Sequence, residues 1–355
     1  YGLPESFSNV VLIYNKDLFD QAGVTYPTDD WTQDDVQNAA EKIRALGDDI
    51  FGIWQPITYN EFFKVVAQYG GSLLNEDKTQ FTINSEENIK AAQTLVDRVL
   101  VSNVQPNSVQ QGGMGDWDMF MSGRLGMIPT GIWAFQTFTE NCDFAWDIAV
   151  EPGSTQKATH FFSNCVVMNP ETEHPEEVAE WLAWLTSSTE SADIRLAAGW
   201  DLPALKDLNA LSSYLEITPP DNRKAVFESL DYLVMPPVIE DYALMSDIIG
   251  QYLSAAADGT MTVTDALNAA QADGEAQTTL GYQLPWRALM RPPSLPKKLR
   301  LFWQKAAPPA SQSFVRQWRT KFTFDGDQYF CRERGLPAKM DLHRFAPAGA
   351  NSTRF

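Results

Sequence analysis

The sequence has little positive charge and no long hydrophobic run. Its 355 residues include 27 Lys and Arg against 46 Asp and Glu, which gives a formal net charge of -19. A phosphate backbone has to be met by clustered Lys and Arg, so this balance argues against a nucleic-acid-binding protein. A membrane-spanning helix needs about 18 or more apolar residues in a row, and the sequence has no such stretch. Tyr1 is neither an initiator Met nor part of a signal peptide, so we expect a start that was cut or processed.

Cysteine and histidine are also scarce, which limits the metal and redox chemistry that the chain can support. Cys142, Cys165 and Cys331 show no paired spacing of the kind that holds zinc or exchanges thiols, so no metal site is predicted. Cys142 and Cys165 could form one disulfide in an oxidising compartment. Two buried free thiols are the interpretation that we favour.

Motifs of catalysis and cofactor binding are missing from residues 1–284. This part has no glycine-rich phosphate loop, dinucleotide fingerprint or nucleophile elbow, so we predict no cofactor and no catalytic residue. His160 and His174 are its only histidines, and neither has the neighbours of a hydrolytic triad. Its 42 acidic residues leave open a glycoside hydrolase that uses two carboxylates, because their separation in space cannot be inferred from sequence.

Charge is distributed unevenly along the chain. Residues 285–355 contain 14 Lys and Arg against 4 Asp and Glu, whereas residues 1–284 contain 13 against 42. The basic segment is rich in Pro and shows no sustained helical or alternating pattern. It could be a basic arm for an acidic surface such as lipid headgroups. The abrupt change favours a fused or frame-shifted segment.

Hydrophobic patterns in residues 1–284 predict alternating strands and helices. The apolar run 10–14 predicts a strand covered on both faces, followed by a short helix that ends at Gly23. Further helices are predicted after Thr32, after Ser85, from Pro175 with Trp181 and Trp184 in the core, and over 241–257 and 264–272. Short strands are predicted at 126–129 and 146–150. This alternation favours an α/β fold with mostly parallel sheets.

Aromatic residues beside polar ones in predicted loops indicate a binding site. A sugar ring presents C–H patches on its faces and hydroxyl groups around its edge, so its site needs flat aromatic platforms and hydrogen-bonding side chains. The segments that offer this mixture are Trp54-Gln55, Tyr59-Asn60, Thr130-Gly131-Ile132-Trp133 and Gly199-Trp200-Asp201.

The order of several short motifs resembles the extracellular solute-binding proteins of carbohydrate ABC transporters, the maltose-binding-protein-like group. These motifs are Tyr14-Asn15-Lys16-Asp17-Leu18-Phe19, Gly70-Gly71, Phe120-Met121-Ser122-Gly123-Arg124-Leu125-Gly126-Met127, Glu151-Pro152-Gly153, His174-Pro175-Glu176-Glu177 and Leu202-Pro203. The resemblance implies a two-lobe α/β fold of the periplasmic-binding-protein type II. In that fold the ligand lies in the cleft between the lobes.

The resemblance also implies domain boundaries. We expect a lobe-crossing segment at 1–9, the second lobe at 10–148, a returning part of the first lobe at 149–208 and closing helices at 209–284, followed by the basic tail 285–355. Most of the first lobe's N-terminal part is expected to be missing.

Function follows from the same resemblance as an expectation. The chain would be the non-enzymatic substrate-binding component of an ABC importer, which binds a sugar or oligosaccharide and delivers it to permease subunits. It would be a monomer at a periplasmic or extracellular location, with or without a lipid anchor. A polyamine or another small polar solute is the alternative ligand. The candidate ligand-binding residues are Trp133, Trp54, Tyr59, Asn60, Gly131, Trp200, Asp201, Phe161 and Tyr242.

Overall fold

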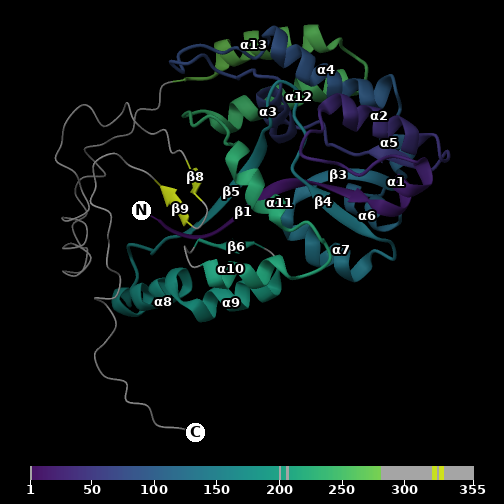
Figure 1. Cartoon of the computed structure of the whole chain (residues 1–355). Coiled ribbons are helices and arrows are strands. Elements are labelled where there is room, and N and C mark those ends of the chain that lie inside the picture. Colours follow the sequence, from purple (N-terminus) through teal and green to yellow (C-terminus); the bar gives the residue numbers. More distant parts are fainter. Residues whose placement is uncertain (1, 200, 205–207, 281–321, 326–327, 332–355) are drawn as a thin grey trace. The chain divides into compact units, whose positions relative to one another are not determined.

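The computed structural model describes residues 2–199, 201–204, 208–280, 322–325 and 328–331, and within them the chain is a mixed α/β structure (Figure 1). The α-helices are α1 (Lys16–Ala22), α2 (Gln33–Arg44), α3 (Tyr59–Gln68), α4 (Glu86–Leu100), α5 (Ser108–Gln111), α6 (Asp116–Met121), α7 (Phe135–Asn141), α8 (Pro175–Ser187), α9 (Thr189–Ala198), α10 (Leu208–Leu215), α11 (Lys224–Glu228), α12 (Tyr242–Ala257) and α13 (Val263–Gln277). The strands are β1 (Leu3–Asn15), β2 (Phe51–Ile53), β3 (Leu125–Gly131), β4 (Trp146–Ala149), β5 (Thr159–Val166), β6 (Leu202–Pro203), β7 (Leu233–Val234), β8 (Phe322–Asp325) and β9 (Gln328–Cys331).

Residues 308–355 form a unit separate from residues 1–307. Its described part is the antiparallel pair of β8 and β9. The remainder of the predicted basic tail lies outside the described residues.

The long strand β1 joins two groups of strands. Its first half, from Leu3 to Asn9, pairs with β5 and β6, whereas its second half, from Val10 to Asn15, pairs with β3 and β4. Every residue from Val10 to Tyr14 is at most 4% exposed, which confirms the prediction of a strand covered on both faces. Residues 3–9 of the predicted crossing segment and the predicted strand that follows them are therefore parts of one continuous strand.

The prediction of mostly parallel sheets is wrong for the described residues. β1 pairs antiparallel with β3, β4, β5 and β6, and only β2 with β3 and β5 with β7 are parallel pairs. The alternation of strands and helices describes one pair correctly, because β2 and β3, which are connected through helices, run parallel. It could not indicate that one central strand runs against all of its partners.

The predicted helix boundaries follow from capping residues. Thr32 accepts a hydrogen bond from the backbone N–H of Asp35, and Asp35 accepts one from the backbone of Thr32, so α2 begins with a complete capping box. Gly23 ends α1 with a φ of 64°, a conformation that favours glycine. Both boundaries were predicted and are confirmed.

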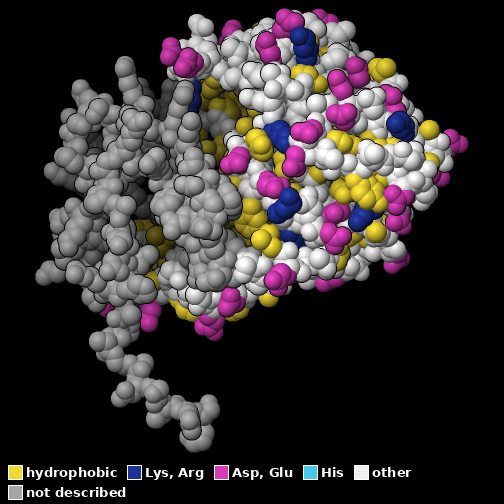
Figure 2. All heavy atoms as spheres, viewed as in Figure 1, with side chains coloured by type: hydrophobic (Ala, Val, Ile, Leu, Met, Phe, Trp, Pro, Cys, Tyr) yellow, Lys and Arg dark blue, Asp and Glu magenta, His cyan; other side chains and the backbone are white. Residues whose placement is uncertain are grey.

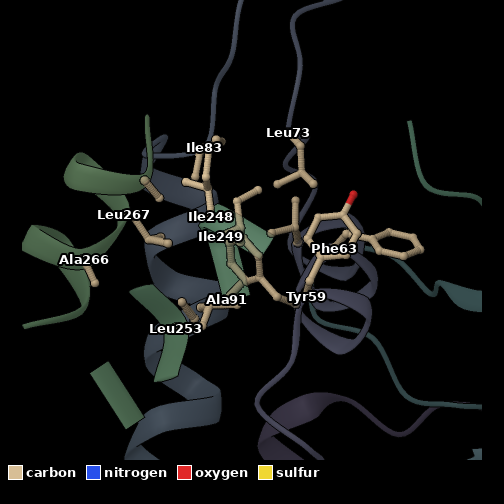
Figure 3. Packing of buried hydrophobic residues seen from close by; sticks show 14 of the residues in the cluster. Tyr59, Phe63, Leu73, Ile83, Ala91, Ile248, Ile249, Leu253, Ala266 and Leu267 are labelled. Carbon is tan, nitrogen blue, oxygen red and sulfur yellow. The ribbon is translucent and has the colours of Figure 1, made fainter. Parts of the chain in front are cut away.

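Four helices from distant parts of the sequence share one hydrophobic core (Figure 3). α3 and α4 contribute residues such as Phe62 and Leu95, and α12 and α13 contribute residues such as Ile249 and Leu267, all of which are fully buried. Figure 3 shows Ile248, Ile249 and Leu267 directed toward the same interior. The helices predicted near the end of residues 1–284 therefore pack against helices encoded about 150 residues earlier, and this packing fixes the position of α3.

Two predictions of burial are wrong. Trp181 is 56% exposed and stacks on Trp184 with ring centroids 5.0 Å apart, and no residue of α8 is fully buried. The spacing of apolar residues in α8 predicted correctly which face of the helix is apolar. It did not predict that the described residues cover this face only in part. Cys142 and Cys165 are free thiols, as predicted, but Cys142 is only half-buried and Cys165 is exposed on β5.

Acidic side chains are scattered over the face of the molecule shown in Figure 2, with few basic ones between them. They form no group that could hold a metal ion among the described residues. No helix within the described ranges is both long enough and apolar enough to cross a lipid bilayer.

Candidate functional site

Aromatic and polar side chains converge on a pocket between α3 and β5. Its volume is about 370 Å³, at the lower end of the range for small-molecule sites. We call it the α3–β5 pocket, and its lining residues are Asn60, Phe63, His160, Phe161, Phe162, Ser163, Asn164, Pro236 and Tyr242. None of these nine side chains is a carboxylate or a Lys or Arg. The pocket therefore offers apolar rings and uncharged or weakly basic hydrogen-bonding groups.

The first turn of α3 forms one wall of the pocket. Thr58 caps this helix by accepting a hydrogen bond from the backbone N–H of Glu61, which fixes where the helix begins. Asn60 and Phe63 then face the pocket from successive turns, since residues three apart lie on the same side of a helix. The Tyr59 ring is buried and contacts the Tyr242 ring of α12 at a centroid distance of 5.7 Å.

The strand β5 forms the opposite wall. Its antiparallel register with β1 places Phe161 beside Asn9 and Asn164 beside Ser6. The Asn164 amide donates a hydrogen bond to the Ser6 hydroxyl at 3.0 Å and lies 3.5 Å from the Asp201 carboxylate. Asp201 also pairs with Arg195 at 2.9 Å. These contacts fix the orientation of the Asn164 side chain.

Trp133 lies next to the pocket, where β3 ends. Its ring contacts that of Phe162 at a centroid distance of 5.4 Å, and 36% of the side chain is exposed. A Cβ atom added at Gly131 would lie 2.1 Å from this ring, so only glycine permits the ring to lie against the backbone here. The geometry leaves Trp133 with a free face beside the aromatic wall.

A buried ionic cluster lies directly behind the pocket. We call it the Lys64 cluster, and it consists of Glu61, Lys64, Glu151 and His160. The Lys64 ammonium is fully buried, 2.7 Å from Glu61 and 2.6 Å from Glu151. The other oxygen of Glu61 lies 3.4 Å from the imidazole Nε2 of His160. Removal of one partner from such a buried ion pair typically lowers the stability of a protein by about 3–5 kcal/mol.

Electrostatics in the cluster favour charged side chains. Burial alone would raise the pKa of Glu61, but the Lys64 ammonium and His160 outweigh it and lower that pKa to about 2. Burial likewise opposes charge on Lys64, yet Glu151 and Glu61 raise the pKa of the ammonium. Burial raises the pKa of Glu151. Glu61 and Lys64 therefore form the strongly ionised pair at neutral pH.

Glutamine side chains extend the cluster into neighbouring elements. The Gln55 amide donates to Glu61 at 3.0 Å and accepts from the Arg98 guanidinium at 2.6 Å. Gln68 donates to Glu151 at 3.2 Å and accepts from Gln33 at 2.9 Å. The network ties α2, α3 and α4 to the chain that leads into β5, so the two walls of the pocket are held at a fixed spacing.

The structure brings together three of the residues predicted from sequence to bind the ligand. Asn60, Phe161 and Tyr242 all line the α3–β5 pocket. Tyr59 lies beneath it, buried against Tyr242. Asp201 reaches it only through Asn164.

The remaining predicted residues are not among those that line the pocket. Trp133 contacts the pocket wall through Phe162, and Gly131 accommodates its ring. Trp54 is half-buried directly after β2 and is not among the nine lining residues. Trp200 lies outside the described residues.

Sequence reasoning missed the lining residues His160, Phe63, Phe162, Ser163, Asn164 and Pro236. The signal for four of them was available, because His160, Phe162, Ser163 and Asn164 flank the predicted Phe161 on one strand. No pattern in the sequence indicated that Phe63, one turn after Asn60, would lie across from this strand.

A second hollow, of about 640 Å³, lies between the loop at Phe81 and the end of α13. Its single aromatic residue, Phe81, is 5% exposed and belongs to the hydrophobic core. This hollow has no free ring on which a ligand could stack, so the smaller α3–β5 pocket is the better binding site.

Comparison with known proteins agrees with this architecture. Residues 1–192 match the family of bacterial extracellular solute-binding proteins. An ABC substrate-binding protein of Listeria monocytogenes in complex with cycloalternan is similar to the chain at 45% identity and a TM-score of 0.74, over 78% of this chain and 71% of that protein. An ABC transporter solute-binding protein of Thermotoga lettingae bound with alpha-D-tagatose matches at 23% identity and a TM-score of 0.68, over 79% and 72%, which supports the fold alone.

Curated relatives are more distant. An arabinooligosaccharide-binding protein of Halalkalibacterium halodurans is 26% identical over 216 residues, which cover 57% of this chain and 47% of that protein. A putative binding protein of Brucella abortus is 26% identical over 224 residues, which cover 61% and 53%. The chain thus spans about half the length of these relatives. The structural matches confirm the predicted two-lobe α/β fold, and the chain belongs to the bacterial extracellular solute-binding proteins.

Proposed function

We propose that the chain is the substrate-binding component of an ABC importer and holds a sugar or oligosaccharide in the α3–β5 pocket. The observation on which this rests most directly is the uncharged, aromatic lining of that pocket in a chain 45% identical to a substrate-binding protein in complex with cycloalternan. The ligand would be bound by stacking and hydrogen bonds, without covalent change.

The chemistry of the lining supports a neutral polyol. Phe161, Phe162 and Tyr242 offer ring surfaces to the C–H faces of a sugar, while Asn60 and Ser163 offer amide and hydroxyl groups to its edges. Trp133 has a free face next to Phe162 and would extend this surface to a further sugar unit.

The same lining argues against the two alternatives. A polyamine would need carboxylates around the rings, and none is among the nine lining residues. A glycoside hydrolase would need two carboxylates that reach the ligand. The nearest buried pair, Glu61 and Glu151, is bound to Lys64 behind the wall.

Nine residues are proposed as ligand-binding, at different distances from the ligand. Asn60, Phe161 and Tyr242 would contact it directly, and Trp133 would stack on it. Tyr59, Gly131 and Asp201 would support these contacts from behind. Trp54 stays a proposed ligand contact on its sequence context alone, and Trp200, proposed on the same ground, lies outside the described residues.

Delivery of the ligand requires a partner in the membrane. The chain would act as a monomer at a periplasmic or extracellular location, with or without a lipid anchor, and hand its sugar to the permease subunits of the importer. The sugar would bind one conformation of the chain more tightly than the others and so stabilise it. The permease would then recognise this ligand-bound conformation.

Substitution of Trp133 tests the assignment of the site. Because the variant Trp133→Ala loses a stacking surface, we expect its dissociation constant for cycloalternan to rise by about tenfold or more in isothermal titration calorimetry. Trp181→Ala is the matched control, since Trp181 is exposed on α8 and does not line the pocket. Equal affinity of the Trp133 variant and the wild-type chain would remove Trp133 from the site.

A further inference from the structure

His160 is the most deeply buried polar residue of the pocket wall, at 4% exposed. We propose that His160 is a ligand-contacting residue whose ring is held by the Lys64 cluster, so that its Nδ1 accepts a hydrogen bond from a hydroxyl group of the sugar. This inference rests on the proposed sugar-binding function and assigns a role within that site to a residue that the sequence patterns did not indicate.

The surroundings of the imidazole ring fix its position. The ring contacts Phe63 at a centroid distance of 4.9 Å and Phe162 at 5.6 Å, and both of these rings also line the pocket. Its Nε2 is fully buried and faces the Glu61 carboxylate at 3.4 Å. Its Nδ1 has no hydrogen-bond partner among the described residues and is not sealed from solvent.

The charge of Glu61 then determines which nitrogen bears the proton. Glu61 is held as a carboxylate by the Lys64 ammonium at 2.7 Å and by the Gln55 amide at 3.0 Å. Nε2 makes no hydrogen bond among the described residues, but the only charged oxygen near it belongs to Glu61. A carboxylate favours a proton on the imidazole nitrogen that faces it, so we assign the proton of the neutral ring to Nε2, which leaves Nδ1 as an acceptor. A sugar hydroxyl can donate to this acceptor, whereas a C–H group at the same place leaves it unpaired.

The charged groups around the ring are Glu61 and Lys64 from α3 and Glu151 from the segment before β5, and none of these three residues lines the pocket. A ligand in the pocket would therefore meet this cluster through the His160 ring.

Titration calorimetry of the full chain with cycloalternan at about pH 8, well above the ordinary pKa of histidine, tests this role. We expect His160→Ala to weaken binding by about tenfold, because it leaves the sugar hydroxyl unpaired. His160→Gln keeps an acceptor and should recover part of the affinity.

His174→Gln is the matched control, because His174 is exposed at the start of α8, outside the pocket. It should retain the affinity of the wild-type chain. Wild-type affinity in His160→Ala would overturn the role of His160 while leaving the proposed function intact. Failure of the wild-type chain to bind any sugar would instead overturn the proposed function, and this inference with it.

Nitrogen-15 spectroscopy of the wild-type chain avoids any effect of substitution on folding. On addition of cycloalternan, the Nδ1 resonance of His160 should shift in the direction of an accepted hydrogen bond, while the resonances of His174 should not move. The variant Glu61→Gln should change the proportion of the two ring tautomers of His160. An unchanged Nδ1 resonance in the saturated protein would contradict the proposed contact.

Discussion

The absence of a side chain at residue 131 determines where the ring of Trp133 lies. A Cβ atom at this position would lie within 2.1 to 2.2 Å of three ring atoms of Trp133, far closer than two carbon atoms can approach. The backbone φ of Gly131 is -78°, which any residue can adopt, so close approach rather than backbone conformation requires glycine.

Gly131→Ala should therefore displace the Trp133 ring and weaken sugar binding. Because 36% of Trp133 is exposed, the ring can move outward without a large loss of core packing. We expect an increase of about fivefold or more in the dissociation constant, measured by calorimetry, and a loss of stability of about 1 kcal/mol or less. Gly250→Ala is the control, since a Cβ atom in that part of α12 meets no atom within 4 Å. A Gly131 variant that binds as tightly as this control would exclude Trp133 as a stacking platform.

Individual site residues were predictable where a ring and a polar neighbour stood together in the sequence. Asn60 was found in this way, beside Tyr59, and it lines the pocket. His160 and Asn164 were missed because their role depends on partners far away in the chain, Glu61 for one and Ser6 for the other. Contacts with a neighbouring strand, or with residues behind the pocket wall, join residues that are distant in the sequence. They therefore produce no pattern among adjacent residues.

At the scale of single elements, the start of α2 depends on one hydroxyl group. Thr32 accepts from the backbone N–H of Asp35, and the Asp35 carboxylate accepts from the backbone and hydroxyl of Thr32 at 2.8 and 2.7 Å. We expect Thr32→Ala to lower the free energy of unfolding by about 1 kcal/mol in urea denaturation. Thr28→Ala, at an exposed loop position just before this cap, should change it by less than about 0.5 kcal/mol. Equal effects of the two substitutions would show that the cap does not stabilise the helix.

The helix α3 contributes Glu61 to a buried ionic cluster, which makes stability depend on pH. The folded-state pKa of Glu61, about 2, lies below its value of about 4.3 in an unfolded chain. The carboxylate therefore stabilises the fold above about pH 4.3, and this contribution, on the order of 2–3 kcal/mol, is lost as pH falls toward 2.

Glu61→Gln should consequently flatten the fall in stability between pH 4.5 and pH 2. The free energy of unfolding, measured by urea denaturation at each pH, should show a smaller slope than in the wild-type chain. Glu87→Gln, at an exposed position in the first turn of α4, should retain the wild-type slope. A Glu61 variant with the full wild-type slope would show that Lys64 does not hold this carboxylate in its charged form.

Most elements could be predicted from local patterns, whereas their pairing could not. The capped starts of α2 and α4, the glycine that ends α1 and the apolar strand within β1 are all set by neighbouring residues. The antiparallel direction of β1 depends instead on which strands reach it after long connections. The partial exposure of α8 likewise depends on what covers it, which its own pattern cannot indicate.

For the whole molecule, long-range contacts join segments that the sequence keeps far apart. Residues 242–277 complete the core begun by residues 59–100, and β1 spans two groups of strands. The order of short motifs predicted the family correctly, since the family of bacterial extracellular solute-binding proteins matches residues 1–192. The position of the pocket between α3 and β5 follows only from the folded arrangement.

The most direct test of the account is a calorimetric titration of the wild-type chain with cycloalternan, maltose and the polyamine spermidine, followed by recovery of the ligand. The account predicts saturable binding of at least one of the two sugars, recovery of that sugar unchanged, and no binding of spermidine, because the pocket lining contains no carboxylate. Binding of spermidine in preference to both sugars, or recovery of a cleaved sugar, would contradict it.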